Sequence, residues 1–235
     1  MRFIRKILRA VDARLLSATA KRARAERITY LGPERLRRLE RWAKGALRAA
    51  SGDVLEFGVA MGGSAILLAE HAVAHDRRFA GFDIFGMIPP PSSDKDDEKS
   101  KERYEVIAAG KSEGIGGDIY YGYQKNLLEE VSGAFDRFGI PVDGDRIQLV
   151  KGLFEDTWPL YGAKEIAFAH IDCDWYDPVK YCLESVSQKI GSGGVIVLDD
   201  YHDYGGCRAA TDEFLAKRQD FEFIDGANVV LRRKN

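Results

Sequence analysis

The spacing of apolar residues predicts helices in the first part of the chain. Apolar side chains recur at helical spacing within residues 2–19 and again within residues 33–50. Pro33 suits the first turn of the second helix, and Ser51-Gly52 ends it. We therefore expect residues 1–50 to form a helical segment that acts as a cap, lid or oligomer contact.

The pattern changes at residue 51 to short apolar runs that alternate with amphipathic stretches. The predicted strands cover residues 53–59, 78–84, 146–150, 166–172 and 195–198, and the predicted helices cover residues 64–74, 123–138, 175–190 and 207–218. Such alternation indicates an α/β fold, a mostly parallel sheet with helices on both faces. Two final runs, 221–224 and 228–231, flank Asp225-Gly226-Ala227 and predict a hairpin, so the last strand should run antiparallel.

Residues 86–121 interrupt this rhythm. They contain Pro89-Pro90-Pro91, a charged run through Arg103 and the glycine-rich stretch 114–117. Such a composition rarely builds a core by itself, and long connections of this kind are usually functional or mobile. We predict a domain spanning residues 51–235 with an insertion at 86–121 that orders over the substrate as a mobile lid.

Composition limits the class of protein. The chain has 235 residues, of which 45% are hydrophobic and 31% charged, as in a globular domain with one added segment. No apolar run approaches the ~20 residues that span a bilayer, and the N-terminus lacks the pattern of a signal peptide. The cysteines Cys173, Cys182 and Cys207 are few and odd in number, which predicts free thiols in a reducing, cytoplasmic environment.

Charge is distributed unevenly along the chain. Residues 1–50 carry a net charge of +11 and the remainder carries −13, within an overall −2. The basic arm could meet nucleic acid, an anionic membrane surface or the acidic body of the protein itself. A basic helix over residues 2–19 would suit a membrane interface. We favour a dimerisation helix or a lid over such peripheral membrane contact, and we expect a homo-oligomer and no nucleic-acid partner.

Glycines follow the first predicted strand. The segment from Glu56 to Ser64 contains Gly58, Gly62 and Gly63, and the next strand ends in Asp83. In a doubly wound sheet, ligands bind at the carboxyl ends of the strands, where glycine permits close approach and an acid can hold ribose hydroxyls. The glycines can equally serve strand–helix packing alone. Their spacing differs from GxGxxG, which disfavours a dinucleotide.

Acidic residues end two later strands. Asp172 and Asp174 follow one strand, and Asp199 and Asp200 follow the next. The strands should be neighbours, so the four carboxylates should converge, and such a cluster of like charges favours a bound cation. Carboxylate oxygens suit Mg²⁺ or Mn²⁺. The alternative is that these are helix caps and turn acids, with Asp174 capping the helix that begins at Trp175.

These motifs together resemble the macrocin O-methyltransferase (TylF-like) family of class I S-adenosylmethionine-dependent methyltransferases. The resemblance runs from about residue 28 to residue 233 and is carried by Leu55-Glu56-Phe57-Gly58-Val59 with Gly62-Gly63, Phe82-Asp83-Ile84-Phe85-Gly86 with Pro89, Lys151-Gly152-Leu153-Phe154-Glu155-Asp156-Thr157-Trp158-Pro159, Ile171-Asp172-Cys173-Asp174-Trp175-Tyr176 and Asp199-Asp200-Tyr201. It implies a Rossmann-like, mostly parallel seven-stranded sheet with an antiparallel last strand. The layout is also similar to that of catechol O-methyltransferases.

The resemblance implies roles for particular residues. Glu56 and the turn from Gly58 through Gly62 and Gly63 to Ser64 would hold the methionine part of S-adenosylmethionine. Asp83 would bind its ribose, and Gly152 and Phe154 would lie near its adenine. Asp172, which also borders the cofactor, would join Asp199 and Asp200 in binding Mg²⁺. Cys173 stands where relatives often have glycine, and the 86–121 insertion is unlike the family, so the acceptor is not fixed.

The expected activity is methyl transfer to a hydroxyl. Mg²⁺ prefers six oxygen ligands, so three aspartates leave room for two acceptor oxygens and water. This favours adjacent hydroxyls, as in a sugar or glycosylated small molecule, with a catechol as the alternative. Asp172, Asp174 and His202 are candidates for the base, whereas His170 should face the sheet packing. A NAD-type oxidoreductase and a non-enzymatic membrane-surface module remain the competing hypotheses.

Overall fold

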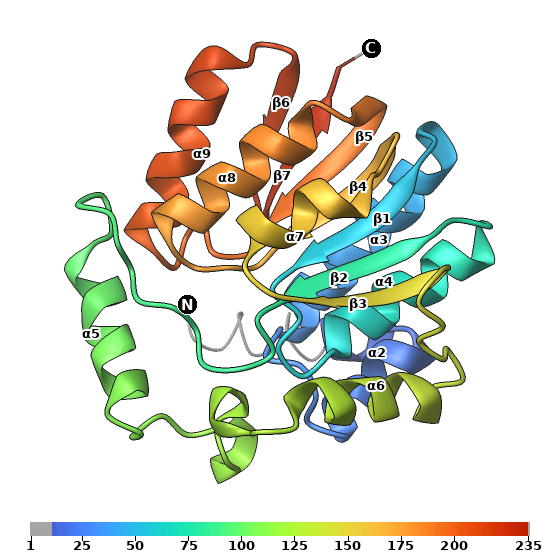
Figure 1. Ribbon diagram of the computed structural model, residues 1–235. Helices are drawn as coiled ribbons and strands as arrows, with labels where there is room; N and C mark the ends of the chain where they lie inside the picture. Colours follow the sequence, from blue (N-terminus) through green and yellow to red (C-terminus); the bar gives the residue numbers. More distant parts are fainter. Residues whose placement is uncertain (1–10, 235) are drawn as a thin grey trace.

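Seven strands form one sheet in the order β3-β2-β1-β4-β5-β7-β6 in the computed structural model, which describes residues 11–234 (Figure 1). The strands are β1 (Asp53–Phe57), β2 (Phe79–Asp83), β3 (Ile147–Lys151), β4 (Ile166–Ile171), β5 (Ile190–Leu198), β6 (Phe221–Ile224) and β7 (Val229–Arg233). The first five pair in parallel, and β7 runs antiparallel to both β5 and β6. The predicted sheet and its reversed last strand are confirmed.

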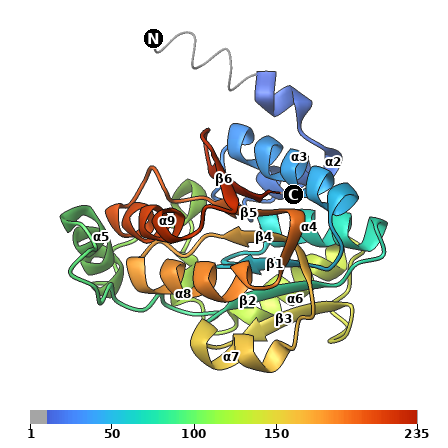
Figure 2. The ribbon, with the colours of Figure 1, turned by 90° about the horizontal axis from the view of Figure 1, so that it is seen from above.

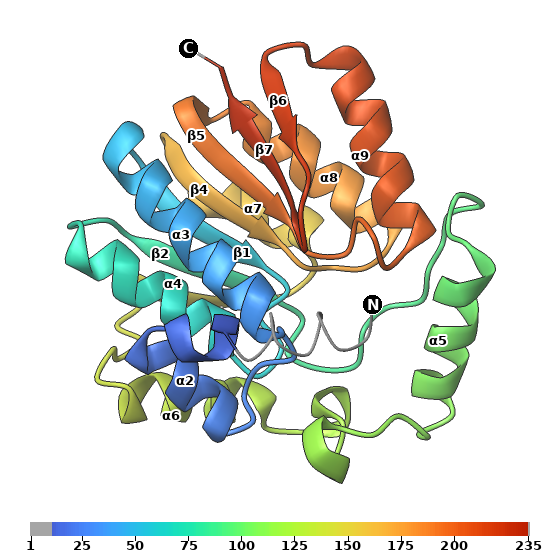
Figure 3. The same cartoon turned by 180° about the vertical axis from the view of Figure 1, so that it is seen from behind.

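Helices cover both faces of this sheet (Figures 2 and 3). One apolar core joins the sheet to α2 (Ala18–Ala25), α3 (Pro33–Ala49), α4 (Gly63–Ala74) and α6 (Leu127–Arg137). A second core joins the opposite face to α7 (Phe154–Tyr161), α8 (Tyr176–Ser187) and α9 (Gly205–Lys217). The sequence pattern did not predict α7, a short helix that contains Pro159.

Strand alternation determines which side chains face α3. Successive side chains of a strand point to opposite faces of the sheet. Val54 belongs to the core under α3 and α4, and Leu55 to the opposite core, so Glu56 faces α3. Glu56 is in register with His170 of β4, and His170 with Val197 of β5. The sheet therefore brings Glu56 and His170 together on its α3 side.

The N-terminal segment differs from the prediction. Residues 11–15 are helical, but the helix ends at Leu15, and Ser17 caps α2 by accepting a hydrogen bond from the Ala20 amide at 3.2 Å. A continuous helix to residue 19 is therefore wrong, because Ser17 satisfies the amides of a new helix start. The rest of that predicted helix, residues 2–10, lies outside the described residues. Within residues 11–234, no helix is long and apolar enough to cross a membrane.

The insertion at 86–121 is partly helical and attached at its beginning. It contains α5 (Glu98–Ala108) and the short 3₁₀ turn η1 (Ile115–Gly117), and a second turn, η2 (Tyr121–Tyr123), delays the start of α6. Asp96 accepts a hydrogen bond from the Tyr176 amide at the start of α8, and Asp97 accepts one from the Gly205 amide at the start of α9. Acidic side chains are favourable at helix N-termini. These contacts attach the insertion to two helices beside the sheet.

Candidate active site

Two cavities meet at the carboxyl ends of the parallel strands. The first, of about 290 Å³, has mostly apolar walls, and the second, of about 330 Å³, contains most of the charged groups. We call them the apolar cavity and the polar cavity. Six residues line both: Gly58, Asp83, Tyr121, Asp172, Asp174 and Trp175. The shared boundary therefore holds three of the six acids predicted from the sequence, Asp83, Asp172 and Asp174.

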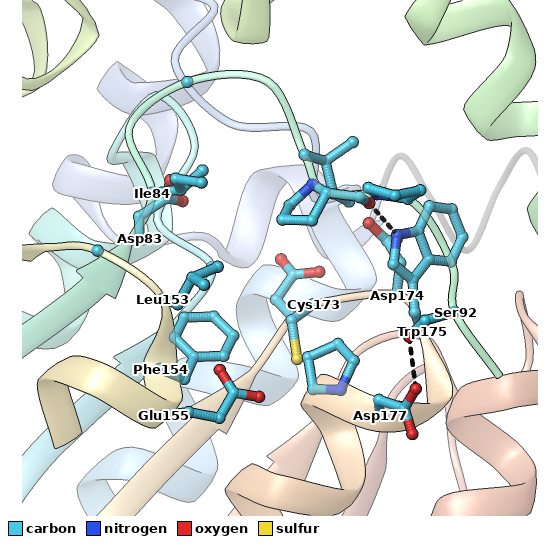
Figure 4. A pocket seen from close by; sticks show the side chains of 18 of the residues that line it. Asp83, Ile84, Ser92, Leu153, Phe154, Glu155, Cys173, Asp174, Trp175 and Asp177 are labelled. Carbon is cyan, nitrogen blue, oxygen red and sulfur yellow. Dashed lines mark hydrogen bonds between the residues drawn. The ribbon is translucent and has the colours of Figure 1, made fainter. Parts of the chain in front are cut away.

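The apolar cavity lies between the insertion and the loops that follow β3 and β4 (Figure 4). Pro89 and Pro90 come from the insertion, Leu153 and Phe154 from the start of α7, and Trp175 from the start of α8. The Trp175 indole N–H donates to the Pro89 carbonyl at 2.9 Å, which fixes the insertion against this wall. Apolar and aromatic walls with a few polar groups are typical of sites that bind a small molecule or a cofactor.

Two glycines that were predicted to contact a ligand do line this cavity. Gly58 has φ +93, and a Cβ there would lie 1.8 Å from the backbone oxygen of Asp172. Gly152 has φ +146, in a region that favours glycine. Both positions keep the backbone close to the cavity without a side chain filling it. Phe154, for which the family resemblance implied a place near the adenine, lines the same cavity.

The other predicted glycines serve packing. A Cβ on Gly62 would lie 2.9 Å from Val131 of α6, and one on Gly63 would lie 2.5 Å from the Ile28 backbone oxygen. The Gly63 amide also donates to that oxygen at 2.8 Å. Neither glycine lines either cavity, nor does the buried Ser64. The first turn of α4 is thus tied to the chain between α2 and α3.

Asp83 is a structural anchor of the turn after β1. Its carboxylate accepts hydrogen bonds from the amides of Val59 (2.8 Å), Ala60 (3.0 Å) and Phe85 (2.6 Å). Burial raises the pKa of Asp83, although these three amides lower it. A carboxylate offers about four acceptor positions, so about one remains for a ligand.

Three carboxylates converge where β4 and β5 end. Ligand atoms of Asp172, Asp199 and Asp200 all lie within 4.8 Å of one another. Burial and the mutual repulsion of the carboxylates raise the pKa values of Asp172 and Asp200 well above the ordinary value. Burial also acts to raise the pKa of Asp199, but the neighbouring His170 and Arg35 lower it. The predicted cluster therefore forms.

Arg35 is a member of the site that the sequence pattern did not identify. From the first turns of α3, its guanidinium donates to Asp199 at 2.6 Å and to Asp203 at 2.5 Å. Both contacts join residues more than 160 positions apart, and no local pattern indicates such pairs. Arg35 supplies one positive charge to a cavity that six aspartates line.

Beneath the cluster lies a second buried pair. His170 Nδ1 is 2.7 Å from Glu56, and its Nε2 is 3.9 Å from Asp199, too long for a hydrogen bond but close enough for charges to attract. Although burial lowers the pKa of His170, Asp199 and Glu56 raise it to about 10. Glu56 lines neither cavity, so the structure places it beneath the cavity surface as the hydrogen-bond partner of His170.

Asp174 borders both cavities. Burial raises its pKa to about 7, although the charges of Arg103 and Lys99 lower it. Its backbone is left-handed, with φ 60, and its amide lies 3.3 Å from Asp200 Oδ2. Asp174 has no role as the cap of α8, because the N-cap position belongs to Trp175. An acid of this pKa can exchange a proton near neutral pH.

His202 is not brought to the site. Its Nε2 lies 2.9 Å from Asp225, its side chain is 38% exposed, and it lines neither cavity. The cysteines are free, as expected, and all three are buried. Only Cys173 reaches the apolar cavity (Figure 4).

Comparison with known proteins places this site in a family. The model of the macrocin-O-methyltransferase (TylF) family matches residues 9–233. An 8-demethyl-8-(2,3-dimethoxy-alpha-L-rhamnosyl)-tetracenomycin-C 4'-O-methyltransferase from Streptomyces olivaceus is 27% identical over 214 residues, or 87% of this chain and 75% of its own length. Mycinamicin III 3''-O-methyltransferase from Micromonospora griseorubida is 28% identical over 194 residues, or 79% and 69% of the two chains.

A solved structure agrees with these matches. The O-methyltransferase NovP superposes with a TM-score of 0.71 at 25% identity, over 88% of this chain and 82% of its own. The family match replaces the NAD-type oxidoreductase and the non-enzymatic membrane module as explanations of the fold. Because that match spans nearly the whole chain, the protein belongs to the macrocin-O-methyltransferase (TylF) family and is an S-adenosylmethionine-dependent O-methyltransferase.

Proposed function

We propose that the protein methylates a hydroxyl of a sugar or a glycosylated small molecule and uses Mg²⁺ or Mn²⁺ to do so. The observation that carries this proposal is the convergence of Asp172, Asp199 and Asp200 at the end of the polar cavity that adjoins the apolar cavity. One relative is named for 4'-O-methylation of a rhamnosyl-tetracenomycin, and another for 3''-O-methylation of mycinamicin III. The proposal extends that chemistry to this chain.

The aspartate cluster fits a divalent cation. Asp199 Oδ1 is buried and has no hydrogen-bond partner among the described residues. Asp172 and Asp200 repel each other and Asp199, and Arg35 contacts Asp199 alone among the three. An uncompensated buried carboxylate is costly, and hard oxygen ligands suit Mg²⁺ and Mn²⁺. A cation at this position would use the free oxygen and offset the repulsion.

The apolar cavity fits S-adenosylmethionine. Gly58 and the remaining acceptor position of Asp83 would contact its polar part, and the Gly152–Phe154 segment would hold the adenine against Leu153 and Phe154. Four other predicted residues would not contact the cofactor directly but would shape the turn that leads into α4: Glu56, Gly62, Gly63 and Ser64. These residues would hold the cofactor in the apolar cavity, beside the boundary that it shares with the polar cavity.

Asp174 is the base in this proposal. S-Adenosylmethionine supplies an already activated methyl group, and a bound divalent ion supplies extra acidity to an acceptor hydroxyl. Asp174 accepts the proton of that hydroxyl from its position at the shared boundary. Trp175 and Tyr121, which border both cavities, exclude water from the same region. His202 has no part in the mechanism.

The test is substitution of a proposed ligand. Asp200→Asn keeps the shape of the side chain and removes one charge, so calorimetry with Mn²⁺ should show affinity lowered by about tenfold or more. Binding of S-adenosylhomocysteine should persist. Asp136→Asn, an equivalent change on an exposed carboxylate of α6, should alter neither. Methyl transfer to a glycoside should stop in EDTA and return with Mg²⁺. Undiminished transfer in EDTA would show that the aspartates act without a metal.

A further inference from the structure

One face of α5 presents positive charge to the polar cavity. Lys99, Arg103 and Ile107 follow one another at four-residue spacing, which places them on the same side of the helix, and all three line the cavity. Among the described residues, neither Lys99 nor Arg103 forms an ion pair with a carboxylate. The two cations therefore differ from Arg35, which two aspartates engage.

Aromatic rings hold these cations in place. The Lys99 ammonium lies 4.7 Å from the centre of the Tyr204 ring and also donates to the Asp203 carbonyl. The Arg103 guanidinium lies 5.6 Å from the centre of the Tyr120 ring. Stacking on a ring leaves the guanidinium N–H donors in the plane of the group available. Arg103 is half-buried, so its charge is partly removed from solvent before any ligand arrives.

Negative charge faces the same cavity from the strand ends. Asp172, Asp199 and Asp200 come from the ends of β4 and β5, whereas α5 stands apart from that edge of the sheet (Figure 1). Asp174 and Asp203 face the cavity from the same strand-end loops, and Arg35 faces it from α3. A ligand that fills this cavity would meet the strand-end acids and also two cations of α5 that no carboxylate pairs among the described residues.

We propose that the acceptor is a phosphorylated sugar whose phosphate binds Lys99 and Arg103 while its reacting hydroxyl lies at the aspartates. This rests on the proposed function. Arginine binds phosphate with two parallel hydrogen bonds, and lysine adds a point charge. A sugar phosphate and a nucleoside-diphosphate sugar share this chemistry, and in the second the base would lie near the tyrosines Tyr30 and Tyr120 of the same cavity.

A simpler role for the two cations is to keep Asp174 ionised. In that case, loss of either charge would slow transfer to every acceptor alike and would leave phosphate binding unchanged. Binding of a phosphate probe without turnover separates the two roles.

The experiment measures binding of thymidine diphosphate, pyrophosphate and thymidine to the full chain by calorimetry. EDTA and saturating S-adenosylhomocysteine are present, so that no metal bridges the phosphates. Thymidine diphosphate and pyrophosphate should bind, and thymidine should bind at least about tenfold more weakly. Arg103→Gln and Lys99→Gln should each weaken the phosphate probes by about tenfold, and Lys101→Gln, an exposed lysine of the same helix, should not. Raising the salt concentration should reduce the difference in phosphate affinity between wild type and these two variants.

The comparison of probes separates a sugar phosphate from a nucleotide sugar as the acceptor, and it separates failure of this inference from failure of the proposed function. Pyrophosphate bound as tightly as thymidine diphosphate assigns the site to a sugar phosphate, and a preference for thymidine diphosphate assigns it to a nucleotide sugar. Equal binding of the phosphate probes by wild type, Arg103→Gln and Lys99→Gln overturns the inference, as does thymidine that binds as tightly as thymidine diphosphate. Failure to bind S-adenosylhomocysteine at all would instead overturn the proposed function.

Discussion

Loss of the buried His170 charge should destabilise the protein strongly. His170 is fully buried between Glu56 and Asp199, and these carboxylates raise its pKa to about 10 from an ordinary 6.5. That difference corresponds to roughly 5 kcal/mol. Removal of one partner of a buried ion pair typically costs ~3–5 kcal/mol. We therefore expect His170→Leu to lower the free energy of unfolding at pH 7 by about 4 kcal/mol.

The measurement is urea denaturation in EDTA, with His202→Leu as the matched control. His202 makes a similar contact with Asp225 on the surface, where such a pair is worth less than ~1 kcal/mol. The pKa of His170 is raised by folding, so its contribution is fully present below about pH 6.5 and is lost as the pH rises through about 10. The stability difference between wild type and His170→Leu should therefore shrink from pH 6 to pH 10.

Two results would refute this reasoning. A loss of less than about 1 kcal/mol, similar to that of His202→Leu, would mean that no buried charge is being compensated. A stability difference that does not change with pH would mean that His170 acts through packing alone. The double variant Glu56→Gln/His170→Leu adds a further check, because residues of one network are not additive and the combined loss should be smaller than the sum.

Two further predictions concern the turn after β1 and the helix α3. Gly58→Ala should abolish S-adenosylhomocysteine binding, measured by calorimetry, and should lower the free energy of unfolding by more than about 1 kcal/mol, because the added Cβ would overlap the main chain. The control is Gly139→Ala, which also has a positive φ but has open space around the added Cβ, and it should retain binding. Burial acts to raise the pKa of Glu40, but hydrogen bonds with His71 and Lys44 outweigh it and lower this pKa to about 2. The ionised Glu40 side chain therefore stabilises the fold above about pH 4.5, and this contribution is lost as the pH falls through about 2. Thermal unfolding of Glu40→Gln should show a loss of about 1–3 kcal/mol at pH 7 and almost none at pH 2; an equal loss at both values would contradict this cause.

The sequence predicted the part of the site that follows from sheet topology. Apolar runs identified β4 and β5 as strands, and neighbouring parallel strands end at the same edge. Asp172, Asp199 and Asp200 were therefore expected together and do lie within 4.8 Å. The reversal of β7 was readable for a similar reason, since only a few residues with a glycine separate it from β6.

Other features depended on contacts that no local pattern contains. Arg35 lies on a helix whose apolar stripe was clear in the sequence. That stripe does not indicate that a residue of the polar face contacts Asp199, which is 164 residues further along the chain. Gly62 and Gly63 had the residue type of a ligand loop, yet their lack of a side chain makes room for Val131 and for the Ile28 carbonyl. A glycine shows that space is needed, and only the fold shows for what.

The helix α5 could have been found. Asp97 caps it by accepting from the Ser100 amide at 3.0 Å, and acids and lysines continue at good helix-forming positions. The prolines before it and the glycines after it concealed this signal. By contrast, α7 is short and contains Pro159, so neither length nor composition indicated a helix.

The attachment of the insertion has an evolutionary consequence. Asp96 and Asp97, whose carboxylates bind the amides at the starts of α8 and α9, precede α5, whereas the carboxylates proposed to perform the chemistry follow the strands of the sheet. Mutations in residues 98–121 can therefore remodel the surface that meets the acceptor without displacing a catalytic group. A change of acceptor would therefore need substitutions only within one stretch of about two dozen residues, and the strand-end carboxylates would stay in place.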